Sequence, residues 1–489
     1  MPKRRPSDVL ASIGGLDRTA GPLGLRIMQH MRQAIGTGEL KAGDRVPSTR
    51  ALATSLGVSR GTVLDVFDQL TAEGYLEAAV GSGTRVAPGL QHRVWPAPAG
   101  QDEDGPGLEP HAARLSAQGR ALAPQAAVPF AIAVPAGAAA PDATWRRLGN
   151  RVRASRAAAP TGYLDPEGIP ELRAAVAEHV RLARAVHCTP DQVIITSGTQ
   201  QGLYLSAQML LAREGRAWAE DPAYPGVTAV LDHLGISTAR IPVDEHGINV
   251  AWAAAACPDA RAAFVTPSHQ YPLGMSMSME RRVALVNWAQ QNHTWLVEDD
   301  YDSELRYAGH PFPSLQGLAP SRVVYLGTFS KVLFPSMRLG YAIVPRPLVG
   351  SYLGARALID RHPPAADQYV LAAYMRAGHF EAHIRRIRIV YGERRSALIG
   401  AVGRHLAGMA TLQPGDQGMH VVLWLPTHVS DVHVAAQAAA AGLAVRPISP
   451  MYAVAPGRSG LMLGFGGFTA GELEAATLQL RDIIKGSSG

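Results

Sequence analysis

Short apolar runs that alternate with helical patterns dominate the chain from about residue 126 onward. Strand-like segments such as QVIITSG, AAFVTPS, TWLVEDD, RVVYLGTFS and LGYAIVP are separated by stretches with a helical period. Strands separated by helices are typical of an α/β fold, in which helices cover a mostly parallel sheet. The alternation therefore predicts one large α/β domain over residues 126–489, with a mostly parallel central sheet.

The whole chain has 489 residues, which leaves room for two to four domains at roughly 100–200 residues each. With 47% apolar and 18% charged residues, it belongs to the soluble globular class. Its net charge of +6 does not require a nucleic-acid partner, although a local basic face could serve one.

The cysteines and the termini bear on the compartment. Cys188 and Cys257 form neither a disulfide framework nor a CxxC metal pair, so we expect both to be buried and the protein to be cytoplasmic. The N-terminal basic residues are not followed by an apolar segment, and no run of about 18 apolar residues occurs. We therefore expect no signal peptide and no membrane span, and we leave the final GSSG outside the fold.

Residues 89–125 interrupt the regular patterns. They are rich in Pro, Gly and Ala, and they carry an acidic patch at residues 102–104. This composition predicts a long, semi-extended linker over 89–125. The linker would separate a small domain at 22–88 from the large one, with residues 1–21 forming an N-terminal arm.

The small domain begins with three predicted helices. Ser48 and Ser59 are candidate N-caps of the second and third helices, and Gly57 turns the chain between them. Residues 75–87, YLEAAVGSGTRVA, then predict two short strands around a Gly-Ser-Gly turn. Helix, tight turn and helix followed by such a hairpin predicts a winged helix-turn-helix. Apolar residues recur with a helical period in the first helix, at Leu25, Met28, Met31 and Ile35. In the third helix, the residues expected to face inward are Val63, Val66, Phe67 and Leu70.

The start of the third helix carries the predicted DNA contacts. Ser59, Arg60 and Thr62 would reach base edges and phosphates in the major groove, with Arg45 and Arg50 near the backbone. Residues 1–90 contain eleven Lys and Arg and eight Asp and Glu, so their net charge is 11 − 8 = +3. This is half of the net charge of +6, carried by less than a fifth of the chain. A small helical domain that binds protein would also fit the helical pattern.

The stretch LKAGDRVPSTRALATSLGVSRGTVLDVFDQLTAEGYLEAAVGSGTRVA resembles the winged helix of GntR-type bacterial repressors nearly end to end. The resemblance implies that double-stranded operator DNA is a partner and is contacted through Arg50, Ser59, Arg60 and Thr62, with Gly83 in the wing. Some members of that group have an arginine where this chain has Leu64. The preferred operator is therefore not implied.

Three motifs in the large domain suggest a phosphorylated ligand. Ser197-Gly198-Thr199 lies between a strand and a helix, where backbone N–H groups favour an anion, although such turns also serve as plain caps. Asp299 ends an apolar strand, which fits a ligand site, a metal site or an acidic loop. Lys331 follows another strand, and burial there would lower its pKa and supply a neutral amine, whereas an isolated lysine is usually solvated.

The order of these motifs resembles the fold type I aminotransferases, which bind pyridoxal 5′-phosphate. With the winged helix ahead of it, the chain is similar to the MocR subfamily of GntR regulators over nearly everything outside the linker. The segments that carry the resemblance are GYLDPEGIPELRAAVAEHV, TSGTQQGL, EDPAYPG, TPSHQYPLG, VEDDYDSELRY and LGTFSKVLFPSMRLGY.

The resemblance implies a role for each matching position. Lys331 would form the internal aldimine, Asp299 would pair with the pyridine nitrogen, and Tyr301 would contact the ring hydroxyl. His269 and Gln270 occupy the loop where aminotransferases place an asparagine, although Tyr271 aligns with that asparagine more closely. Tyr224 would stack on the ring, Tyr163 would reach a phosphate across a dimer interface, and the remaining phosphate contacts would be Gly198, Thr199, Ser330 and Arg338.

Two departures from the aminotransferase pattern concern the effector. Met462 stands where those enzymes carry an arginine for the substrate carboxylate, and Arg446 and Arg458 lie nearby in sequence as substitutes. Gly226 stands where at least one amino-acid-sensing relative has a second arginine. A simple amino acid held by those two arginines is therefore not supported.

The resemblance leaves three functional hypotheses. The first is a homodimeric transcription regulator, with or without domain swapping, that senses an amine or amino-acid effector, or pyridoxal phosphate itself. The second is a working aminotransferase with an attached DNA-binding head. The third is a fusion that binds no cofactor, which the retained cofactor contacts disfavour.

Overall fold

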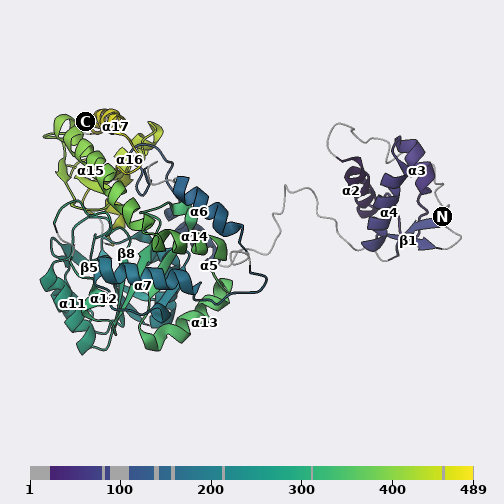
Figure 1. Cartoon of the computed structure of the whole chain (residues 1–489). Coiled ribbons are helices and arrows are strands. Elements are labelled where there is room, and N and C mark those ends of the chain that lie inside the picture. The colour runs from purple at the N-terminus through teal and green to yellow at the C-terminus, as the bar shows by residue number, and fades with distance from the viewer. Residues whose placement is uncertain are drawn as a thin grey trace. The chain divides into compact units, whose positions relative to one another are not determined.

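The computed structural model describes residues 22–79, 83–88, 110–136, 143–155, 160–211, 215–309, 312–453 and 457–487. The chain divides into two units, residues 1–108 and 109–489. Figure 1 shows the elements of each, and we describe each unit by itself. The predicted N-terminal arm, 1–21, lies outside the described residues.

The small unit contains the predicted helices and hairpin. They are α2 (Leu23–Gly36), α3 (Thr49–Leu56), α4 (Arg60–Ala72), β1 (Leu76–Ala79) and β2 (Gly83–Val86), with β1 and β2 antiparallel. The two predicted caps are present, because Ser48 Oγ accepts a hydrogen bond from Ala51 N at 3.2 Å and Ser59 Oγ accepts one from Thr62 N at 3.1 Å. Gly57 ends α3 in the left-handed conformation, with φ of 63°.

The core of the small unit shows which side of α2 is buried and confirms the prediction for α4. In α2, Leu25 of the periodic apolar set is 49% exposed, whereas Met28 is partly buried and packs against the core. Apolar residues occur on more than one side of this helix, and contact with α4 selects the side that is buried. The buried residues are Ile27, Met31, Ala34 and Ile35 in α2 and, as predicted, Val63, Val66, Phe67 and Leu70 in α4.

The predicted linker is shorter than expected, because its second half belongs to the large unit. Residues 110–121 form helix α5 (Pro110–Ala121), which begins with a proline and is rich in the good helix formers Ala, Arg and Gln. Gln118 Nε2 donates a hydrogen bond to Asp232 of α9 at 2.5 Å, so α5 lies against the large unit. A Pro- and Gly-rich composition alone did not reveal this helix.

The large unit is built on an eight-stranded sheet, ordered β3-β10-β9-β8-β7-β4-β5-β6. Strands β9, β8, β7, β4 and β5 pair in parallel, whereas β10 is antiparallel to both of its neighbours. The predicted mostly parallel sheet is confirmed. The strands are β3 (Val193–Thr196), β4 (Arg216–Asp221), β5 (Ser237–Asp244), β6 (Gly247–Ile248), β7 (Ala262–Val265), β8 (Trp295–Asp300), β9 (Val323–Thr328) and β10 (Gly340–Ile343).

Helices cover this sheet, and a smaller sheet follows it in the chain. The smaller sheet is antiparallel, in the order β11-β12-β14-β13, and α15, α16 and α17 lie beside it (Figure 1). Its strands are β11 (Thr411–Gln413), β12 (His420–Trp424), β13 (Arg446–Pro447) and β14 (Gly460–Gly464). The helices are α6 (Ala143–Arg153), α7 (Pro170–Arg184), α8 (Thr199–Leu210), α9 (Pro225–His233), α10 (Val250–Ala256), α11 (Met279–Gln291), α12 (Leu315–Leu318), α13 (Val349–Asp360), α14 (Ala365–Arg376), α15 (His379–His405), α16 (Asp431–Ala440) and α17 (Ala470–Gly486).

The central strands are buried on both faces, which explains why they are continuous apolar runs in the sequence. Cys188 and Cys257 are free and buried, as expected. Within the described ranges, no helix is both long and apolar enough to cross a membrane.

Candidate functional site

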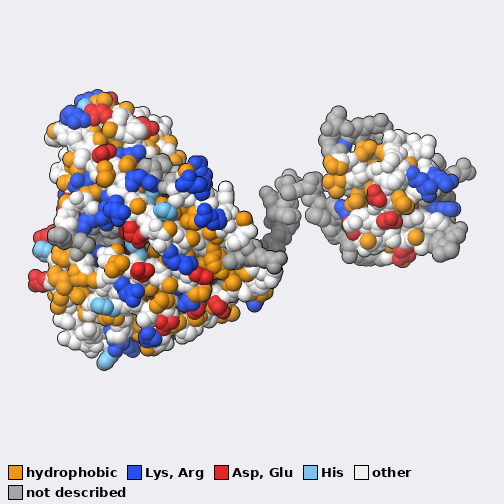
Figure 2. Space-filling model, in the orientation of Figure 1, with side chains coloured by type: hydrophobic (Ala, Val, Ile, Leu, Met, Phe, Trp, Pro, Cys, Tyr) orange, Lys and Arg blue, Asp and Glu red, His pale blue; other side chains and the backbone are white. Residues whose placement is uncertain are grey.

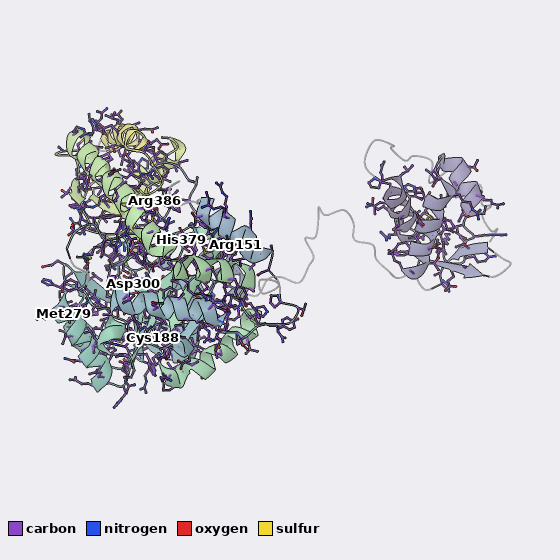
Figure 3. The ribbon with its side chains drawn as sticks, viewed as in Figure 1. Arg151, Cys188, Met279, Asp300, His379 and Arg386 are labelled. Carbon is purple, nitrogen blue, oxygen red and sulfur yellow. The ribbon has the colours of Figure 1, made fainter. Side chains whose placement is uncertain are left out.

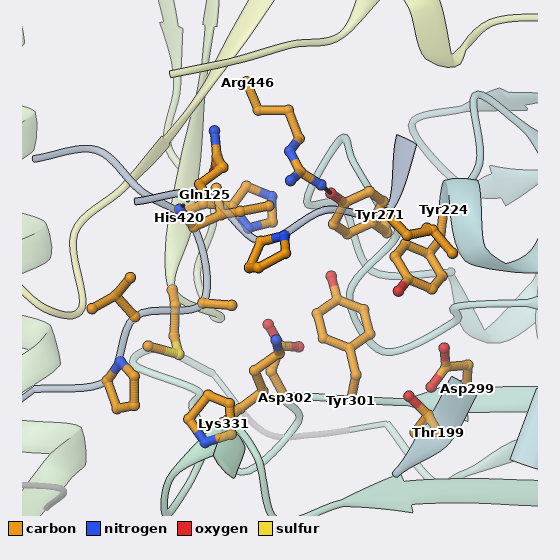
Figure 4. A pocket seen from close by; sticks show the side chains of 18 of the residues that line it. Gln125, Thr199, Tyr224, Tyr271, Asp299, Tyr301, Asp302, Lys331, His420 and Arg446 are labelled. Carbon is orange, nitrogen blue, oxygen red and sulfur yellow. Dashed lines mark hydrogen bonds between the residues drawn. The ribbon is translucent and has the colours of Figure 1, made fainter. Parts of the chain in front are cut away.

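A cavity of about 390 Å³ lies beyond the carboxyl ends of β7, β8 and β9, where parallel sheets commonly bind ligands. Figure 4 shows its polar side chains converging from several elements. Its wall includes residues of the large sheet, the small sheet and the segment that follows α5. The lining residues are Leu122, Ala123, Pro124, Gln125, Ile132, Ala133, Val134, Pro135, Thr199, Tyr224, Thr266, Tyr271, Asp299, Tyr301, Asp302, Lys331, Pro335, Met419, His420 and Arg446.

Lys331 lies at the edge of this cavity, three residues after β9. Its side chain is half-buried. Burial lowers the pKa of the Lys331 ammonium, and the nearby carboxylates of Asp302 and Asp299 only partly oppose this effect. A lysine with a lowered pKa presents more of the neutral amine, which is the nucleophilic form.

Asp299, at the end of β8, is buried beside the lysine. Burial, helped by the charge of Asp300, raises the pKa of the Asp299 carboxyl to about 7. Its Oδ1 atom has no hydrogen-bond partner among the described residues. An acceptor buried in this way is unfavourable by itself. A ligand with a protonated ring nitrogen would satisfy Asp299, because its N–H would supply the missing donor.

Tyr301 lines the cavity from the loop after β8, and its hydroxyl contacts a buried histidine. Its hydroxyl lies 3.1 Å from His269 Nδ1, which also lies 2.8 Å from Asp302 Oδ2. The imidazole also packs against Gly418, where a Cβ would lie 2.1 Å from the His269 Cε1 atom. His269 thus contacts the Tyr301 hydroxyl, and its predicted contact with a ligand remains a prediction. The neighbouring Gln270 turns away and donates to the backbone oxygens of Pro222 and Tyr271.

The predicted phosphate contacts come together at the start of α8. Gly198 is its N-cap residue with φ of 97°, a conformation that favours glycine. A Cβ at Gly198 would lie 3.3 Å from an Arg338 guanidinium nitrogen, and Arg338 donates to Ser197 O. Close to Lys331 in the sequence, Thr328 Oγ1 donates a hydrogen bond to Ser330 Oγ at 3.1 Å. The N-terminus of α8 and the Arg338 guanidinium thus lie close together, an arrangement that suits a phosphate.

The aromatic wall explains one departure from the aminotransferase pattern. The Tyr224 ring packs edge-on against Tyr271, with ring centres 5.3 Å apart and planes at 79°. A Cβ at Gly226 would lie 2.2 Å from the Tyr224 ring and 2.3 Å from Gln200 Oε1. An arginine at 226 is therefore incompatible with this position of Tyr224.

The two candidate effector arginines differ in position. Arg446 lines the cavity and donates to the Tyr271 hydroxyl at 3.3 Å. It is also the cross-strand neighbour of the buried Met462, so a guanidinium stands one strand away from its usual aminotransferase position. Arg458 instead lies over the Trp424 ring, 3.8 Å from its centre, and is not part of the cavity wall.

Tyr163 lies away from the cavity of its own chain. Its side chain is 76% exposed, and the guanidinium carbon of Arg361 lies 4.3 Å from the ring centre. An exposed tyrosine beside an arginine is compatible with contact to another chain. The structure contains one chain, so the predicted contact across a dimer remains a prediction.

The predicted DNA contacts lie at the surface of the small unit. Arg45, Arg50 and Arg60 are exposed, and Figure 2 shows basic side chains gathered at one edge of this unit. Ser59 Oγ is occupied by its cap and by Thr62 Oγ1 at 2.8 Å, so these two hydroxyls order the start of α4. In the wing, a Cβ at Gly83 would lie 3.0 Å from Arg45 Nε, so glycine there admits the arginine.

Several lining residues were not identified from the sequence. Asp302 belongs to the acidic motif, but only Asp299 and Tyr301 were assigned there. His420, whose pKa falls to about 3 because it is buried, comes from the small sheet. Residues 122–125 were assigned to the linker, and residues 132–135 were assigned to the large domain without a role in the site. Alternation along β8 accounts for Asp299 and Tyr301 but not for Asp302, because Asp300 faces away from the cavity and accepts a hydrogen bond from Arg184 at 2.8 Å, and Asp302 lies beyond the end of the strand.

Two family models match the chain. The model of the GntR family of bacterial regulatory proteins matches residues 23–86, and that of the class I and II aminotransferases matches residues 134–474. The probable rhizopine catabolism regulatory protein MocR of Rhizobium meliloti is 37% identical over 454 residues, 92% of each chain. The pyridoxine biosynthesis transcriptional regulator PdxR of Corynebacterium glutamicum is 35% identical and covers 94% of this chain and 95% of its own.

This chain is a MocR-type transcriptional regulator of the GntR family. The small unit of this MocR-type regulator is its DNA-binding domain, and the large unit has the fold type I aminotransferase fold. The structure of α-aminoadipate aminotransferase LysN from Thermus thermophilus, solved with N-(5′-phosphopyridoxyl)-L-leucine, matches the large unit. Its TM-score is 0.71 and its identity 26%, over 78% of this chain and 97% of LysN. The predicted family, fold class and regulator function are confirmed.

Proposed function

We propose that the large unit of this regulator binds pyridoxal 5′-phosphate and uses it to sense an amine or amino-acid effector. The observation that carries the proposal is the unpartnered Oδ1 atom of Asp299 beside a lysine whose pKa is lowered. Both features are unfavourable in an empty protein, and a pyridine ring with an aldehyde would relieve both. Pyridoxal phosphate, when bound, supplies an aldehyde that condenses with amines and a ring that withdraws electrons.

The residues of this chain would divide the work as follows. Lys331 provides the amine on the protein side, and Asp299 holds a proton on the ring nitrogen. Tyr301, held by His269 and Asp302, donates toward the ring hydroxyl, and Tyr224 and Tyr271 close one side of the cavity. The phosphate is held by the N-terminus of α8 and by Gly198, Thr199, Ser330 and Arg338.

The effector would enter between the ring and Arg446. This guanidinium lines the cavity and stands opposite Met462, the place of the usual substrate arginine, so it is suited to a carboxylate or another anionic group on the amine. Arg458 is stacked on Trp424 outside the cavity wall, and we therefore assign no effector contact to it. Pyridoxal phosphate as its own effector would use the same residues without Arg446.

The regulator would act on DNA in the cytoplasm as a homodimer. The exposed Tyr163 fits the expectation that each cofactor site receives a side chain from the partner chain, and a dimer presents two DNA-binding units to an operator. Whether the units exchange between partners depends on the connection over residues 89–109.

Covalent trapping tests the proposal directly. The sequence has only four lysines, Lys3, Lys41, Lys331 and Lys485, so a reduced adduct can be mapped without ambiguity. We expect the purified protein to be yellow, and borohydride to bleach it and leave a pyridoxyl group on Lys331. Lys331→Ala removes this adduct, whereas the matched control Lys485→Ala retains it.

A colourless protein that takes up no added pyridoxal phosphate contradicts the proposal. Amines are then screened against the loaded protein by absorbance. A spectral change with each effector and no continuing production of keto acid supports sensing. Sustained transamination between an amino donor and a keto acid supports an attached enzyme instead.

A further inference from the structure

A second cavity, of about 460 Å³, lies on the large unit away from the cofactor site. It is formed by the C-terminal end of α7, the loop after β8 and the first turns of α15, helices that Figure 1 shows on the same face. None of its lining residues belongs to the first cavity. They are His179, Leu182, Ala183, Arg184, Ser303, Glu304, Arg306, Gly309, Glu381, Ile384, Arg385 and Arg388.

Two buried hydrogen-bond donors in this wall lack acceptors. His179 is 8% exposed, and its Nε2 atom has no hydrogen-bond partner among the described residues. The carboxylates of Glu304 and Glu381 lie 3.8 and 3.6 Å from the two imidazole nitrogens, beyond hydrogen-bond distance. Arg306 Nε is likewise buried and without a partner in the described part of the chain. Because the groups left unsatisfied are donors, the group that would complete them is an acceptor.

The charge of the cavity points the same way. Burial opposes protonation of His179, but the contacts with Glu304 and Glu381 prevail and raise its pKa to about 9. Arg184 is already neutralised by Asp300, which is labelled in Figure 3, at 2.8 Å. The charges that remain are two carboxylates, Glu304 and Glu381, and four cations, His179, Arg306, Arg385 and Arg388.

The guanidinium groups of Arg385 and Arg388 are exposed on successive turns of α15, at the mouth of the cavity. Arg388 uses Nε to donate to Glu304 O, which leaves its terminal nitrogens for a ligand. A fork of guanidinium donors above a protonated imidazole is a favourable arrangement for planar or tetrahedral oxyanions.

We propose that this second cavity binds a small metabolite through an oxyanion group, either a carboxylate or a phosphate. The site is independent of the cofactor and of the amine effector. The two cavities share the loop after β8. Tyr301 and Asp302 line the first cavity, and Ser303, Glu304 and Arg306 line the second. A ligand in the second cavity would therefore contact the segment that positions Tyr301.

Calorimetric titration of the full-length, cofactor-loaded protein tests the proposal. The probes are inorganic phosphate and succinate, and loading with pyridoxal phosphate keeps the phosphate contacts at α8 occupied. We expect saturable binding of at least one probe. The double variant Arg385→Gln/Arg388→Gln should bind roughly tenfold or more weakly, because each lost charge-assisted hydrogen bond lowers affinity by about that factor.

The matched control is Arg151→Gln, which removes an exposed arginine of α6 that lines neither cavity and should bind like the parent protein. Binding of phosphate alone identifies a phosphorylated ligand, and binding of succinate alone identifies a carboxylate, and either supports the site. If neither probe binds saturably, or if the double variant binds as tightly as the parent, the proposal fails. Should the double variant not fold, as judged by circular dichroism, His179→Gln takes its place with the same expected loss.

Discussion

The DNA-binding unit and the large unit each have a helix N-terminus that is predicted to face an anion, but the two helix ends have opposite surroundings. At α4 the neighbouring arginines are exposed, and at α8 the surrounding groups include the buried Asp299 and the half-buried Lys331. Exposed charges bind nucleic acid through long-range attraction that depends on the salt concentration. Buried charges acquire shifted pKa values and can take part in covalent chemistry. Under the proposed function, the small unit would recognise DNA reversibly, whereas the large unit would retain a cofactor.

The largest effect expected from this contrast is at Asp299. Asp299→Ala removes the acceptor for the ring nitrogen in a buried site, and we expect the affinity for pyridoxal phosphate to fall by about 100-fold or more. Equilibrium titration followed by absorbance measures the loss. Asp259→Ala, which removes an exposed carboxylate outside the cavity wall, is the control and should bind normally. An unchanged affinity in Asp299→Ala would show that this carboxylate does not hold the ring.

The same burial predicts a pH dependence of stability in the cofactor-free protein. The folded pKa of Asp299 is raised to about 7 from an ordinary value near 3.8, so the folded state binds the extra proton. Its contribution therefore favours folding at low pH and is lost as the pH rises from about 4 to about 7. We expect apo Asp299→Asn to exceed the parent in free energy of unfolding by about 1 to 3 kcal/mol at pH 8, with the difference shrinking toward pH 4. Chemical denaturation of both proteins at pH 8 and pH 4 measures the difference in free energy of unfolding. The same difference at both pH values would contradict the raised pKa of Asp299.

A smaller effect is expected at Arg446. Arg446→Gln keeps a donor for the Tyr271 hydroxyl but removes the charge, so the affinity of a carboxylate-bearing effector should fall by about tenfold while cofactor binding stays unchanged. Arg458→Gln is the matched control and should leave both affinities unchanged. The spectral titration of the loaded protein distinguishes the two variants, and equal losses in both would remove Arg446 from the effector site.

The smallest effect is expected at Arg60, an exposed arginine at the start of α4. Arg60→Ala should weaken operator binding several-fold at moderate salt and reduce the slope of log affinity against log salt by about 1, if it contacts one phosphate. Fluorescence anisotropy at several salt concentrations provides both numbers. Arg32→Ala removes an arginine already paired with Glu73 and should leave the slope unchanged. A normal slope in Arg60→Ala would place DNA contact elsewhere than the start of α4.

The sequence was sufficient for local features that depend on a few neighbouring residues. Short patterns predict the caps at Ser48 and Ser59, the turn at Gly57 and the buried strands of the large sheet. They do so because helix capping, left-handed backbone and burial on both faces each favour particular residue types. The motifs around Gly198, Asp299 and Lys331 were likewise recognisable, since each has its own chemistry.

Tertiary structure decided what depends on partners distant in sequence. Contact with α4 selected Ile27 over Leu25 as the buried face of α2, and packing against α9 fixed α5 within a segment of linker-like composition. Pairing of β13 with β14 brought Arg446 into the cavity and left Arg458 outside it. The physical reason is that packing and strand register depend on how the surfaces of two elements fit together. A motif contains only its own residues and carries no information about the partner surface.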